Sequence, residues 1–252
     1  MSRAPGLTMP AYQQPNENFL IRPMQLSDTW LVAPLAATEY FDSDLNAYLC
    51  SRRHEYPDHV TRRFARMIQG RYFNPRSLGF VAVTASSPYK PIAYAQFARL
   101  GNDEAALDLV AQRASFWRTL QKWWLAIQAS IVDFFWPDRS VDHRAMRKFM
   151  RSVERDRLQY WDSPEMKAKY ENRWQAQSVV VSSAYQRRGI GRMLMAEVLG
   201  RAQEEGVVVG LEASGEGERL YSSLGFALRG PFSMNVGPPA GGVMMWTPSK
   251  NQ

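Results

Sequence analysis

At 252 residues the chain is long enough for one large domain, or for one domain that carries an insertion. A hydrophobic content of 45% and a charged content of 22% are ordinary globular values, and they exclude a chain that is disordered throughout. The net charge of +7 would suit nucleic acid or an anionic membrane as a partner. The arginines are scattered and form no long basic block, however, so we expect neither.

The only cysteine, Cys50, excludes a disulfide within the chain and suits a reducing compartment. The N-terminus shows no charged stretch followed by an apolar one, so we expect no secretory signal. The most apolar window, residues 123–136, contains Gln128 and Asp133 and is too short and too polar to span a bilayer. We therefore expect a cytoplasmic protein.

The chain opens with residues 1–18, which are rich in Pro, Gln and Asn and predict a flexible leader. Residues 19–23 follow as a short strand that a proline ends. A helix through residues 30–36 comes next, and either Ser27 or Asp28 can serve as its N-cap.

A polar turn is expected over residues 41–46, and two histidines with carboxylates between them follow it. His54 and His59 are five residues apart rather than four, and Pro57 interrupts any helix that they would share. The pair therefore does not predict a metal site. A second helix is expected over about 58–69.

Two strands, 79–84 and 92–99, flank a proline turn and predict a hairpin. The next stretch, about 101–173, has a helical pattern and is rich in aromatic side chains. Apolar residues recur there at helical spacing, at Leu120, Trp123, Trp124, Ile127, Ile131 and Phe134. A highly charged helix is expected over 141–160. We expect most of the aromatics to form a small core of their own.

The residues from Gln177 to Gly191 combine a strand, a turn and the start of a helix. A buried strand is predicted by the β-branched run Val179, Val180 and Val181. The turn and helix start are formed by Gln186, Arg187, Arg188, Gly189, Ile190 and Gly191. Glycines let the backbone approach an anion, and the first helical N–H groups have no partner within the helix. The sequence therefore predicts a phosphate site, and a basic turn that only caps a surface helix is the alternative.

Downstream, an apolar stripe predicts a helix over 190–202 that Gly206 ends. Residues 207–213 predict another strand. Ser214 can cap a short helix whose first turn is acidic, and Gly225 closes that helix. A closing hairpin is predicted over 226–236 and 242–246.

Two motifs in this region form a known combination. The turn Gln186–Gly191 has the pattern Q-x-x-G-x-G after a strand, and Leu220–Phe226 has the pattern L-Y-x-x-x-G-F at the end of a helix. In this order, with a strand between them, they resemble the signature of the acyl-CoA-dependent N-acetyltransferase superfamily, GNAT. Leu211–Ser214 also resembles the L-E-A-S variant of fungal members. The motifs cover about residues 176–226, and the rest of the chain is similar in pattern only.

The resemblance implies an α/β (α+β) GNAT fold, which is a mixed, mostly antiparallel, twisted sheet of about six to seven strands flanked by helices. Residues 19–252 then form a single domain. Compact members pass quickly from the early hairpin to the cofactor-binding strand, so residues 101–173 are interpreted as a helical insertion between the third and fourth strands. Besides forming a core, this insertion can overhang the acceptor site and line it with aromatics.

The same resemblance implies acetyl-CoA as co-substrate, with no metal and no acyl-enzyme. The coenzyme A diphosphate would lie against the amides and side chains of Gln186–Arg192. The pantetheine arm can pair with the edge of the strand Val179–Val181, where a backbone N–H can also meet the thioester oxygen. Many relatives have an asparagine near the start of the last helix. Ser214 stands there instead, which puts part of the usual hydrogen bonding to the cofactor arm in doubt.

Tyr221 occupies the position of the family's tyrosine acid, which protonates the leaving thiolate; a packed helix residue is the alternative. The attacking amine must be neutral, and a free alkylamine has a pKa of about 10.4, so a base or a desolvated site is required. Glu212 ends a strand on the face opposite to Leu211 and Ala213. It is the preferred base, through a water, and a salt bridge with an arginine is its alternative. Weaker candidates are Asp142 and His143.

The leading hypothesis is an acetyltransferase that acts on an amine, or a hydroxyl, of a small molecule, as a monomer or a homodimer. The second is a protein lysine or N-terminal acetyltransferase, which predicts an open peptide groove. The third is a non-catalytic acyl-CoA-binding protein, and the presence of Tyr221 argues against it.

Overall fold

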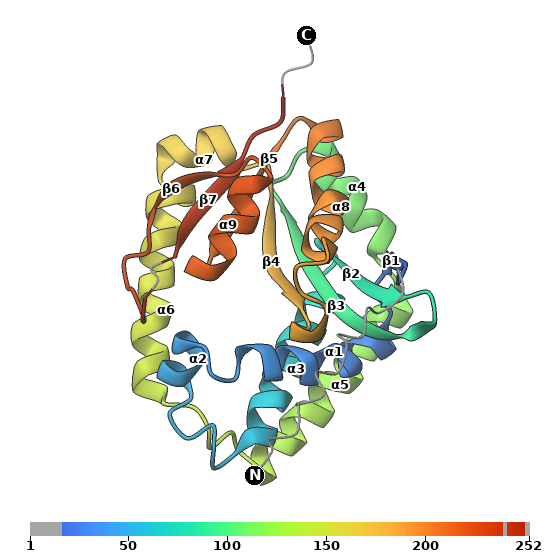
Figure 1. The fold of residues 1–252 in the computed structure, drawn as a ribbon, viewed down its shortest axis with the longest axis vertical. Helices are drawn as coiled ribbons and strands as arrows, with labels where there is room; N and C mark the ends of the chain where they lie inside the picture. The colour runs from blue at the N-terminus through green and yellow to red at the C-terminus, as the bar shows by residue number, and fades with distance from the viewer. Residues whose placement is uncertain (1–16, 239–240, 250–252) are drawn as a thin grey trace, which may run out of the picture.

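The computed structural model describes residues 17–238 and 241–249, so nearly all of the predicted leader lies outside the described residues. Within them the chain forms a seven-stranded sheet with the order β1-β2-β3-β4-β5-β7-β6 (Figure 1). In chain order the strands are β1 (Phe19–Pro23), β2 (Ser77–Thr84), β3 (Ser87–Leu100), β4 (Arg173–Val181), β5 (Val208–Ala213), β6 (Ala227–Pro231) and β7 (Gly242–Trp246). Neighbouring strands are antiparallel except β4 and β5. The predicted early strands and the closing hairpin are confirmed, but the turn of the early hairpin lies at residues 85–86, and Pro88 and Pro91 of the predicted proline turn belong to β3.

Helices cover both faces of this sheet, which confirms the predicted fold class of a mixed, mostly antiparallel sheet flanked by helices. They are α1 (Leu26–Tyr40), α2 (Asp44–Leu49), α3 (Pro57–Phe73), α4 (Glu104–Arg113), α5 (Phe116–Phe135), α6 (His143–Arg157), α7 (Pro164–Tyr170), α8 (Ile190–Glu205) and α9 (Gly215–Ser223), with a π-helical turn η1 (Leu158–Asp162) and a 3-10 turn η2 (Ser183–Tyr185). In the described part of the chain, none of them has both the length and the apolar composition that crossing a bilayer requires.

The face of the sheet under α8 and α9 carries the larger core. Leu194, Val198 and Ala202 of α8 are at most 1% exposed and pack on the sheet together with Phe97 and Leu211. These positions repeat at helical spacing, so the predicted amphipathic helix is confirmed. Its predicted end is also confirmed, because Gly206 follows the helix with a left-handed φ of 67°.

The opposite face is covered by α1 and α3. Val32 of α1 and Ile68 of α3 are fully buried against Val81, Tyr94 and Val180. Successive side chains of a strand point to opposite faces. Val180 therefore contacts the α1 and α3 layer, while the valines on either side of it face α8.

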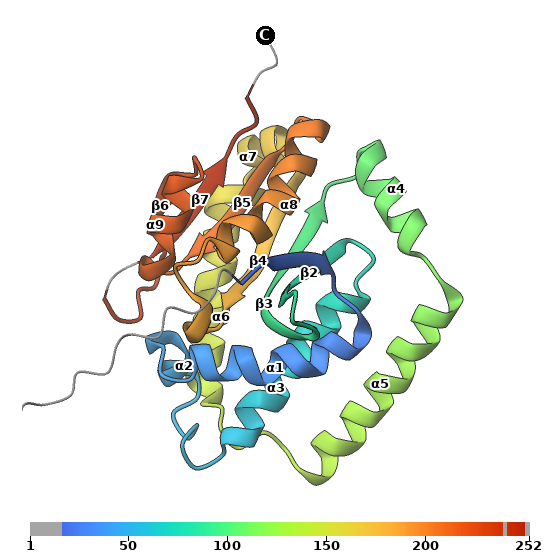
Figure 2. The same ribbon diagram turned by 45° about the vertical axis from the view of Figure 1, so that its right-hand side comes forward.

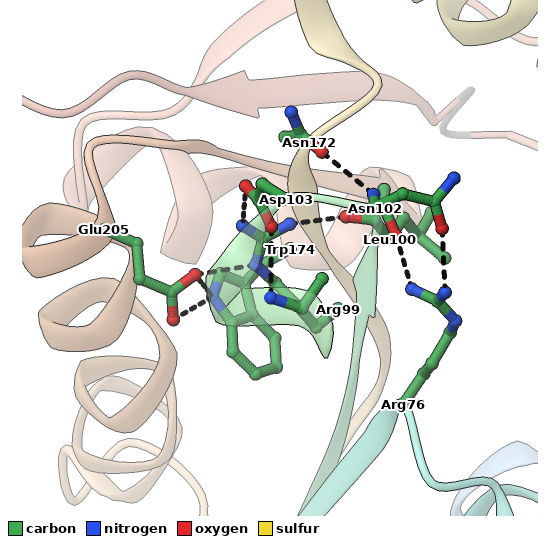
Figure 3. A network of polar contacts seen from close by, with 10 residues as sticks. Arg76, Arg99, Leu100, Asn102, Asp103, Asn172, Trp174 and Glu205 are labelled. Atoms are coloured by element: carbon green, nitrogen blue, oxygen red, sulfur yellow. Dashed lines mark hydrogen bonds and ion pairs between the residues drawn. The ribbon is translucent and has the colours of Figure 1, made fainter. Parts of the chain in front are cut away.

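A buried ion-pair network ties the two halves of the chain together at one end of the sheet (Figure 3). Arg99, near the end of β3, has a side chain that is 1% exposed, and its Nε lies 2.6 Å from a carboxylate oxygen of Glu205 at the end of α8. Its Nη2 lies 2.5 Å from Asp103, which caps α4. Trp174 of β4 donates its indole N–H to Glu205 at 3.2 Å. Arg99 thus links β3 to α8 and to the start of α4, and Glu205 joins β4 to the same network.

Two local predictions near the N-terminus are wrong in detail. Helix α1 begins at Leu26, and its cap is Gln25 rather than Ser27 or Asp28. Asp28 lies inside the first turn, where it accepts the amide of Gln25 at 2.7 Å and pairs with Arg22 at 2.6 Å. Asp28, which was predicted to precede the helix, thus lies inside it and completes its capping box.

The turn predicted over 41–46 ends in the short helix α2. Ser43 caps this helix by accepting the amide of Asn46 at 3.3 Å. With only six residues, the helix is too short to show an apolar period, which is why the sequence pattern missed it.

Four α-helices and η1 connect β3 to β4, so this stretch is helical as predicted. Trp161 and Tyr170 are buried against β5 and β7, so these two aromatics pack on the central sheet and do not form a core of their own as expected. The expectation is also wrong for α5, which has no buried residue. The charged helix predicted over 141–160 is α6, which ends at Arg157 and continues as η1.

Candidate functional site

The sheet opens where its parallel pair ends. β4 and β5 pair only over Arg173–Ala176 and Val208–Leu211. Beyond these residues β4 stays paired with β3 as far as Val181, and β5 stays paired with β7 as far as Ala213. The edge of β4 from Gln177 onward therefore has no strand partner on its β5 side among the described residues. We call this opening the fork, and α9 and α8 lie to either side of β4 there in Figure 1.

A left-handed turn joins β4 to α8. Arg187 has a φ of 60° and Gly189 a φ of 83°, which is a region that L side chains rarely adopt. Gly191 follows in the first helical turn, where a Cβ would lie 3.0 Å from Cδ2 of Leu220 on α9. The two glycines thus let the chain bend and let α8 start close to α9. The predicted order of strand, turn and helix is confirmed.

The N-terminus of α8 presents backbone amides at the fork. The amide of Met193 donates to the carbonyl of Gly189 at 3.1 Å, so the amides of Ile190, Gly191 and Arg192 precede the first bond of the helical ladder. Helix α8 has 16 residues, and its dipole places partial positive charge at this end. Such an end favours an anionic ligand.

The turn is held in place from two sides. Gln186 donates its side-chain N–H to the carbonyl of Val181 at 3.1 Å, which fixes the turn to the end of β4. Glu39, in the last turn of α1, accepts the amide of Ser183 at 2.8 Å. Glu39 was not predicted to have a role, because it is 144 residues away in sequence.

Three exposed arginines surround the N-terminus of α8. Arg188 donates to the carbonyl of Ala184 at 3.2 Å, and Arg192 donates to the hydroxyl of Ser223 at 3.1 Å. Arg187 is the third and holds the left-handed position of the turn. Positive side chains and amides that face one solvent-exposed turn are the features that a polyphosphate needs.

Tyr221 lies on α9, whose predicted cap is confirmed because Ser214 accepts the amide of Gly217 at 3.2 Å. The ring of Tyr221 packs edge-on against Phe226, with 5.7 Å between ring centroids. Burial raises the pKa of Tyr221, and the nearby Tyr40 raises it further. The hydroxyl therefore stays protonated at neutral pH and is able to donate a proton.

Glu212 is the first residue of β5 beyond the fork. Leu211 and Ala213 are each 1% exposed, whereas Glu212 is exposed, so it faces the other way as strand alternation predicts. Gln175 donates to both of its carboxylate oxygens, at 3.0 and 3.1 Å. Desolvation by the surrounding groups raises the pKa of Glu212, and the hydrogen bond from Gln175 partly offsets this rise.

Two arginines that were not predicted act electrostatically on Glu212. Arg173 of β4 lies over the ring of Trp161, with 4.6 Å from its Cζ to the ring centroid. Arg71, in the last turn of α3, donates to the hydroxyl of Ser178 on β4 at 2.5 Å. No motif marks either arginine. Arg173 belongs to β4 itself, whereas Arg71 reaches the fork through the packing of α3, which is distant in sequence.

Two tyrosines complete the polar surroundings of the fork. Tyr94 of β3 is fully buried, and its hydroxyl has no hydrogen-bond partner within the residues described. Tyr40 ends α1 and stacks on Phe64 with 5.8 Å between ring centroids. Burial raises the pKa of both tyrosines. We define the fork cluster as Tyr40, Arg71, Tyr94, Gln175, Ser178 and Glu212.

One weaker candidate base has a structural role instead. Asp142 caps α6 by accepting the amides of Ala145 and Arg144 at 3.0 and 2.8 Å, and these bonds lower its pKa. A base needs the opposite shift. His59 accepts the amide of Arg139 at 3.0 Å. Across residues 17–238 and 241–249, no group of three or more His, Cys, Asp or Glu side chains is placed to hold a metal ion.

The predicted cofactor-binding residues therefore gather along one edge, from the end of β4 through the turn to α8 and α9. Val180 and Ile190 point into the two cores, so only their backbone groups are able to meet a ligand. Tyr221 and Glu212 have different neighbours. Tyr40 raises the pKa of Tyr221, whereas Gln175 donates a hydrogen bond to the carboxylate of Glu212.

Comparison with known proteins agrees with this geometry. The family model described as "Acetyltransferase (GNAT) domain" matches residues 158–228, which include the fork, the turn and α9. No curated protein matches the chain. The resemblance of Leu211–Ser214 to fungal members stays a prediction.

Several solved structures share the fold. One is described as histone acetyltransferase HPA2 and related acetyltransferase from Corynebacterium glutamicum, with a TM-score of 0.57, 14% identity, and 92% of this chain and 98% of that chain covered. A second is a polyamine N-acetyltransferase from Drosophila melanogaster, with a TM-score of 0.55, 13% identity, and coverage of 90% and 98%. A third is arylalkylamine N-acetyltransferase 2 from Aedes aegypti, with a TM-score of 0.55, 13% identity, and coverage of 91% and 99%. The chain thus has the GNAT fold.

Proposed function

We propose that this protein is an acetyltransferase that moves an acetyl group from acetyl-CoA to the amine of a small molecule, by direct attack within a ternary complex. The observation that carries the proposal is the N-terminus of α8, with its three arginines, beside the unpaired edge of β4. The family model for the acetyltransferase (GNAT) domain covers this part of the chain. Two proteins with the same fold are amine N-acetyltransferases, which favours an amine acceptor.

Coenzyme A fits the fork in two respects. Its diphosphate would accept from the amides of Ile190–Arg192 and pair with Arg187 and Arg188. Its pantetheine arm has amides like those of a peptide and would add to the free edge of β4 along Val179–Val181. Ser214 already accepts the amide of Gly217 as the cap of α9, so it would offer the arm its hydroxyl proton and one remaining lone pair.

Tyr221 would act as the general acid. When the amine attacks the thioester carbonyl, the C–N bond forms and the C–S bond breaks, and the sulfur leaves with the electron pair. The raised pKa of Tyr221 keeps its proton in place at neutral pH, so the hydroxyl is able to protonate the departing thiolate.

Glu212 would act as the general base, through a water. The amine must lose a proton before or during its attack, and an ordinary carboxylate with a pKa of about 4.3 is a weak base for this step. Burial raises the pKa of Glu212 toward the working pH, and the Gln175 amide fixes the carboxylate in one orientation. The alternative, a direct salt bridge, has no support among the described ion pairs.

A second candidate function is acetylation of a protein lysine or N-terminus. One structure with this fold is described as a histone acetyltransferase and related acetyltransferase, which favours this alternative. It requires that an extended peptide reach the fork.

Thiol release from acetyl-CoA tests these functions together. Pools of small amines, small alcohols and short peptides are compared, and calorimetry measures acetyl-CoA binding without an acceptor. We expect release with amines. Peptides that are acetylated as well as any amine would favour the second function. Binding of acetyl-CoA without release from any pool would indicate a non-catalytic acyl-CoA-binding protein, and absence of binding would reject the proposal.

A further inference from the structure

Arg71 stands in the fork cluster without a counter-ion in contact. It is half-buried, and the only hydrogen bond of its guanidinium to a described residue is the one to Ser178 at 2.5 Å. A guanidinium has five N–H groups, so four remain without an acceptor in the part of the chain that the structure describes. No described carboxylate lies within the 4.0 Å that defines an ion pair for this arginine.

The surroundings of Arg71 leave its charge poorly compensated. Burial lowers its pKa, and Tyr94, Tyr40 and Glu212 act on it only from a distance. Glu212, the only carboxylate among these three, has both of its oxygens bonded to Gln175. A half-buried cation costs free energy unless an anion pairs with it. The donors of Arg71 that have no protein acceptor are therefore suited to an anion from outside the chain.

We propose that the acceptor carries a carboxylate that pairs with Arg71 while its amine faces Glu212, so that the substrate class is amino-acid-like rather than a simple amine. This inference rests on the proposed function. The two opposite charges at the fork match a zwitterion, and the planar guanidinium presents paired donors that fit a carboxylate. Ser178 holds the guanidinium from the β4 side and leaves its other donors available.

The test compares acceptors in matched pairs, each an amino acid and the amine that lacks its carboxylate. We expect kcat/KM to be at least tenfold higher for the carboxylated member. Arg71→Met should lower that value by about 10- to 150-fold, the range for one hydrogen-bonded charge pair, mainly through KM. The decarboxylated partner should lose much less, because Arg71 would affect it only through the pKa of Glu212. Arg71→Lys should recover part of the loss, and Arg62→Met on the same helix should change neither acceptor.

Equal losses for both members of each pair, or a preference for the decarboxylated member, would overturn the inference. If no acceptor supports thiol release, the proposed function fails. The anion site at Arg71 is then tested separately, by measuring whether the same carboxylates raise the Tm of the protein. A rise in Tm for the wild-type protein but not for Arg71→Met would support the anion site. The same rise in both proteins, or none in either, would reject it.

A second observation, independent of the reaction, concerns helix α5. Its apolar stripe faces away from the protein, and Figure 2 shows α5 as the outermost element along one side. The side chains of the stripe are 50% to 79% exposed: Phe116, Leu120, Trp123, Trp124, Ile127, Ile131 and Phe134. The body-facing side is half-buried and includes Arg118 and Ala129. Arg66 of α3 bonds Asp133 and the carbonyl of Ala129 there.

The stripe is too large for the free surface of a monomer. Aromatic side chains expose about 200 Å² each when free, so the seven side chains offer on the order of 800 Å². The largest apolar patch on a typical monomer is about 300–600 Å². Each partner of a standard protein interface buries about 800 Å². The area matches what a stable dimer needs.

The edges of the stripe favour a second copy over a lipid surface. On the helical wheel the stripe is flanked by Thr119 and Ser130 on one side and by Gln121 and Gln128 on the other, all of them neutral. Helices that lie on anionic membranes have basic residues beside the apolar face. The cations of α5, Arg118 and Lys122, lie toward the opposite side.

We infer that α5 pairs antiparallel with α5 of a second copy of this chain. A two-fold arrangement centred at the level of Leu125 sets Phe116 against Phe134 and Trp123 against Ile127. The other large side chains of the stripe, Leu120, Trp124 and Ile131, then lie opposite the smaller Ser130, Ala126 and Thr119. The two copies of Phe116 are then about 27 Å apart, from the rise of 1.5 Å per residue.

Sedimentation equilibrium at micromolar concentrations tests the pairing. We expect a dimer for the wild-type protein and for Tyr89→Glu, a control at an 85% exposed aromatic on β3, and a monomer for Ile127→Glu with an unchanged circular dichroism spectrum. Oxidation should link a mixture of Phe116→Cys and Phe134→Cys chains but not Phe116→Cys alone. A wild-type monomer, a dimer that survives Ile127→Glu, or a monomer that co-sediments with anionic vesicles would each overturn the inference.

Discussion

The side-chain amide of Gln175 on β4 donates to both carboxylate oxygens of Glu212 on β5, at 3.0 and 3.1 Å. Gln175 lies in the last paired stretch of the two strands, and Glu212 lies one residue beyond it. The bond therefore spans the point where the strands part. It holds a carboxylate of raised pKa in one orientation at the mouth of the fork.

The pH dependence of the reaction should report this carboxylate. Glu212 acts as a base only when ionised, and its raised pKa places the acidic limb of kcat/KM above the ordinary value of about 4.3. Gln175 lowers that pKa through its hydrogen bond, so Gln175→Leu should move the limb to higher pH. Glu212→Gln should reduce kcat/KM by about 10²- to 10⁴-fold. Initial rates between pH 5 and 9 measure both effects.

The control for this prediction is Glu204→Gln, an isosteric change at an exposed residue of α8. It should leave the rate and its pH profile unchanged. A Glu212→Gln enzyme that keeps the wild-type profile would show that a different group takes the proton.

Tyr221→Phe should lower kcat by about a hundredfold, within the range for loss of a general acid, with little change in the KM for acetyl-CoA. The hydroxyl lost is buried and has a raised pKa, so the ring packing against Phe226 should persist. Steady-state kinetics with a good acceptor measure the change. Tyr89→Phe, at an exposed tyrosine, is the matched control. An unaltered turnover rate and pH profile in Tyr221→Phe would rule out the acid role.

Gly191→Trp should weaken acetyl-CoA binding by at least tenfold, because even a Cβ at this position would lie 3.0 Å from Leu220, and an indole would displace the start of α8 or occupy the fork. Gly200→Trp on the same helix is the matched control, since a Cβ there meets nothing within 4 Å. Calorimetry gives the two dissociation constants. If both variants bind acetyl-CoA like the wild type, the N-terminus of α8 does not hold the cofactor.

The local parts of this site could be predicted from the sequence, and the long-range parts could not. The valine run, the glycine turn and the amphipathic period of α8 are set by neighbouring residues. Arg71 and Ser178 are 107 residues apart, and no local pattern records that they meet. The period of α5 likewise shows that one face is apolar, but it does not show what that face contacts.

The position of the fork could not be predicted from the sequence either. Its position depends on the last paired residues of β4 and β5, Ala176 and Leu211, which is a property of strand register rather than of composition. Glu39 is a further case, because it bonds the turn from α1 across 144 residues. Motifs mark the candidate site in the sequence, and tertiary packing adds side chains to it that no motif marks.

Arg99→Met should destabilise the protein by about 3–5 kcal/mol, because it leaves Glu205 and Asp103 without their shared cation in a buried network. Arg157→Met is the control. Arg157 pairs with Glu154 at 2.9 Å on the surface of α6, and such exposed pairs contribute about 0–1 kcal/mol. Urea unfolding followed by circular dichroism measures both free energies. Equal losses in the two variants would mean that the Arg99 network is not special for stability.

Glu212→Gln should stabilise the fold in a pH-dependent way. The pKa of Glu212 is higher in the folded protein than in the unfolded chain, so the folded state binds more protons between the two values. The contribution of Glu212 to stability is therefore greatest below the unfolded pKa of about 4.3 and is lost as pH rises through the folded pKa. The gain in Tm from Glu212→Gln should be near zero at pH 4 and largest at pH 8, and calorimetry across this range measures it. The control Glu204→Gln, at an exposed residue, should show no such trend. A gain for Glu212→Gln that is larger at pH 4 than at pH 8 would mean that the folded protein favours the ionised carboxylate of Glu212.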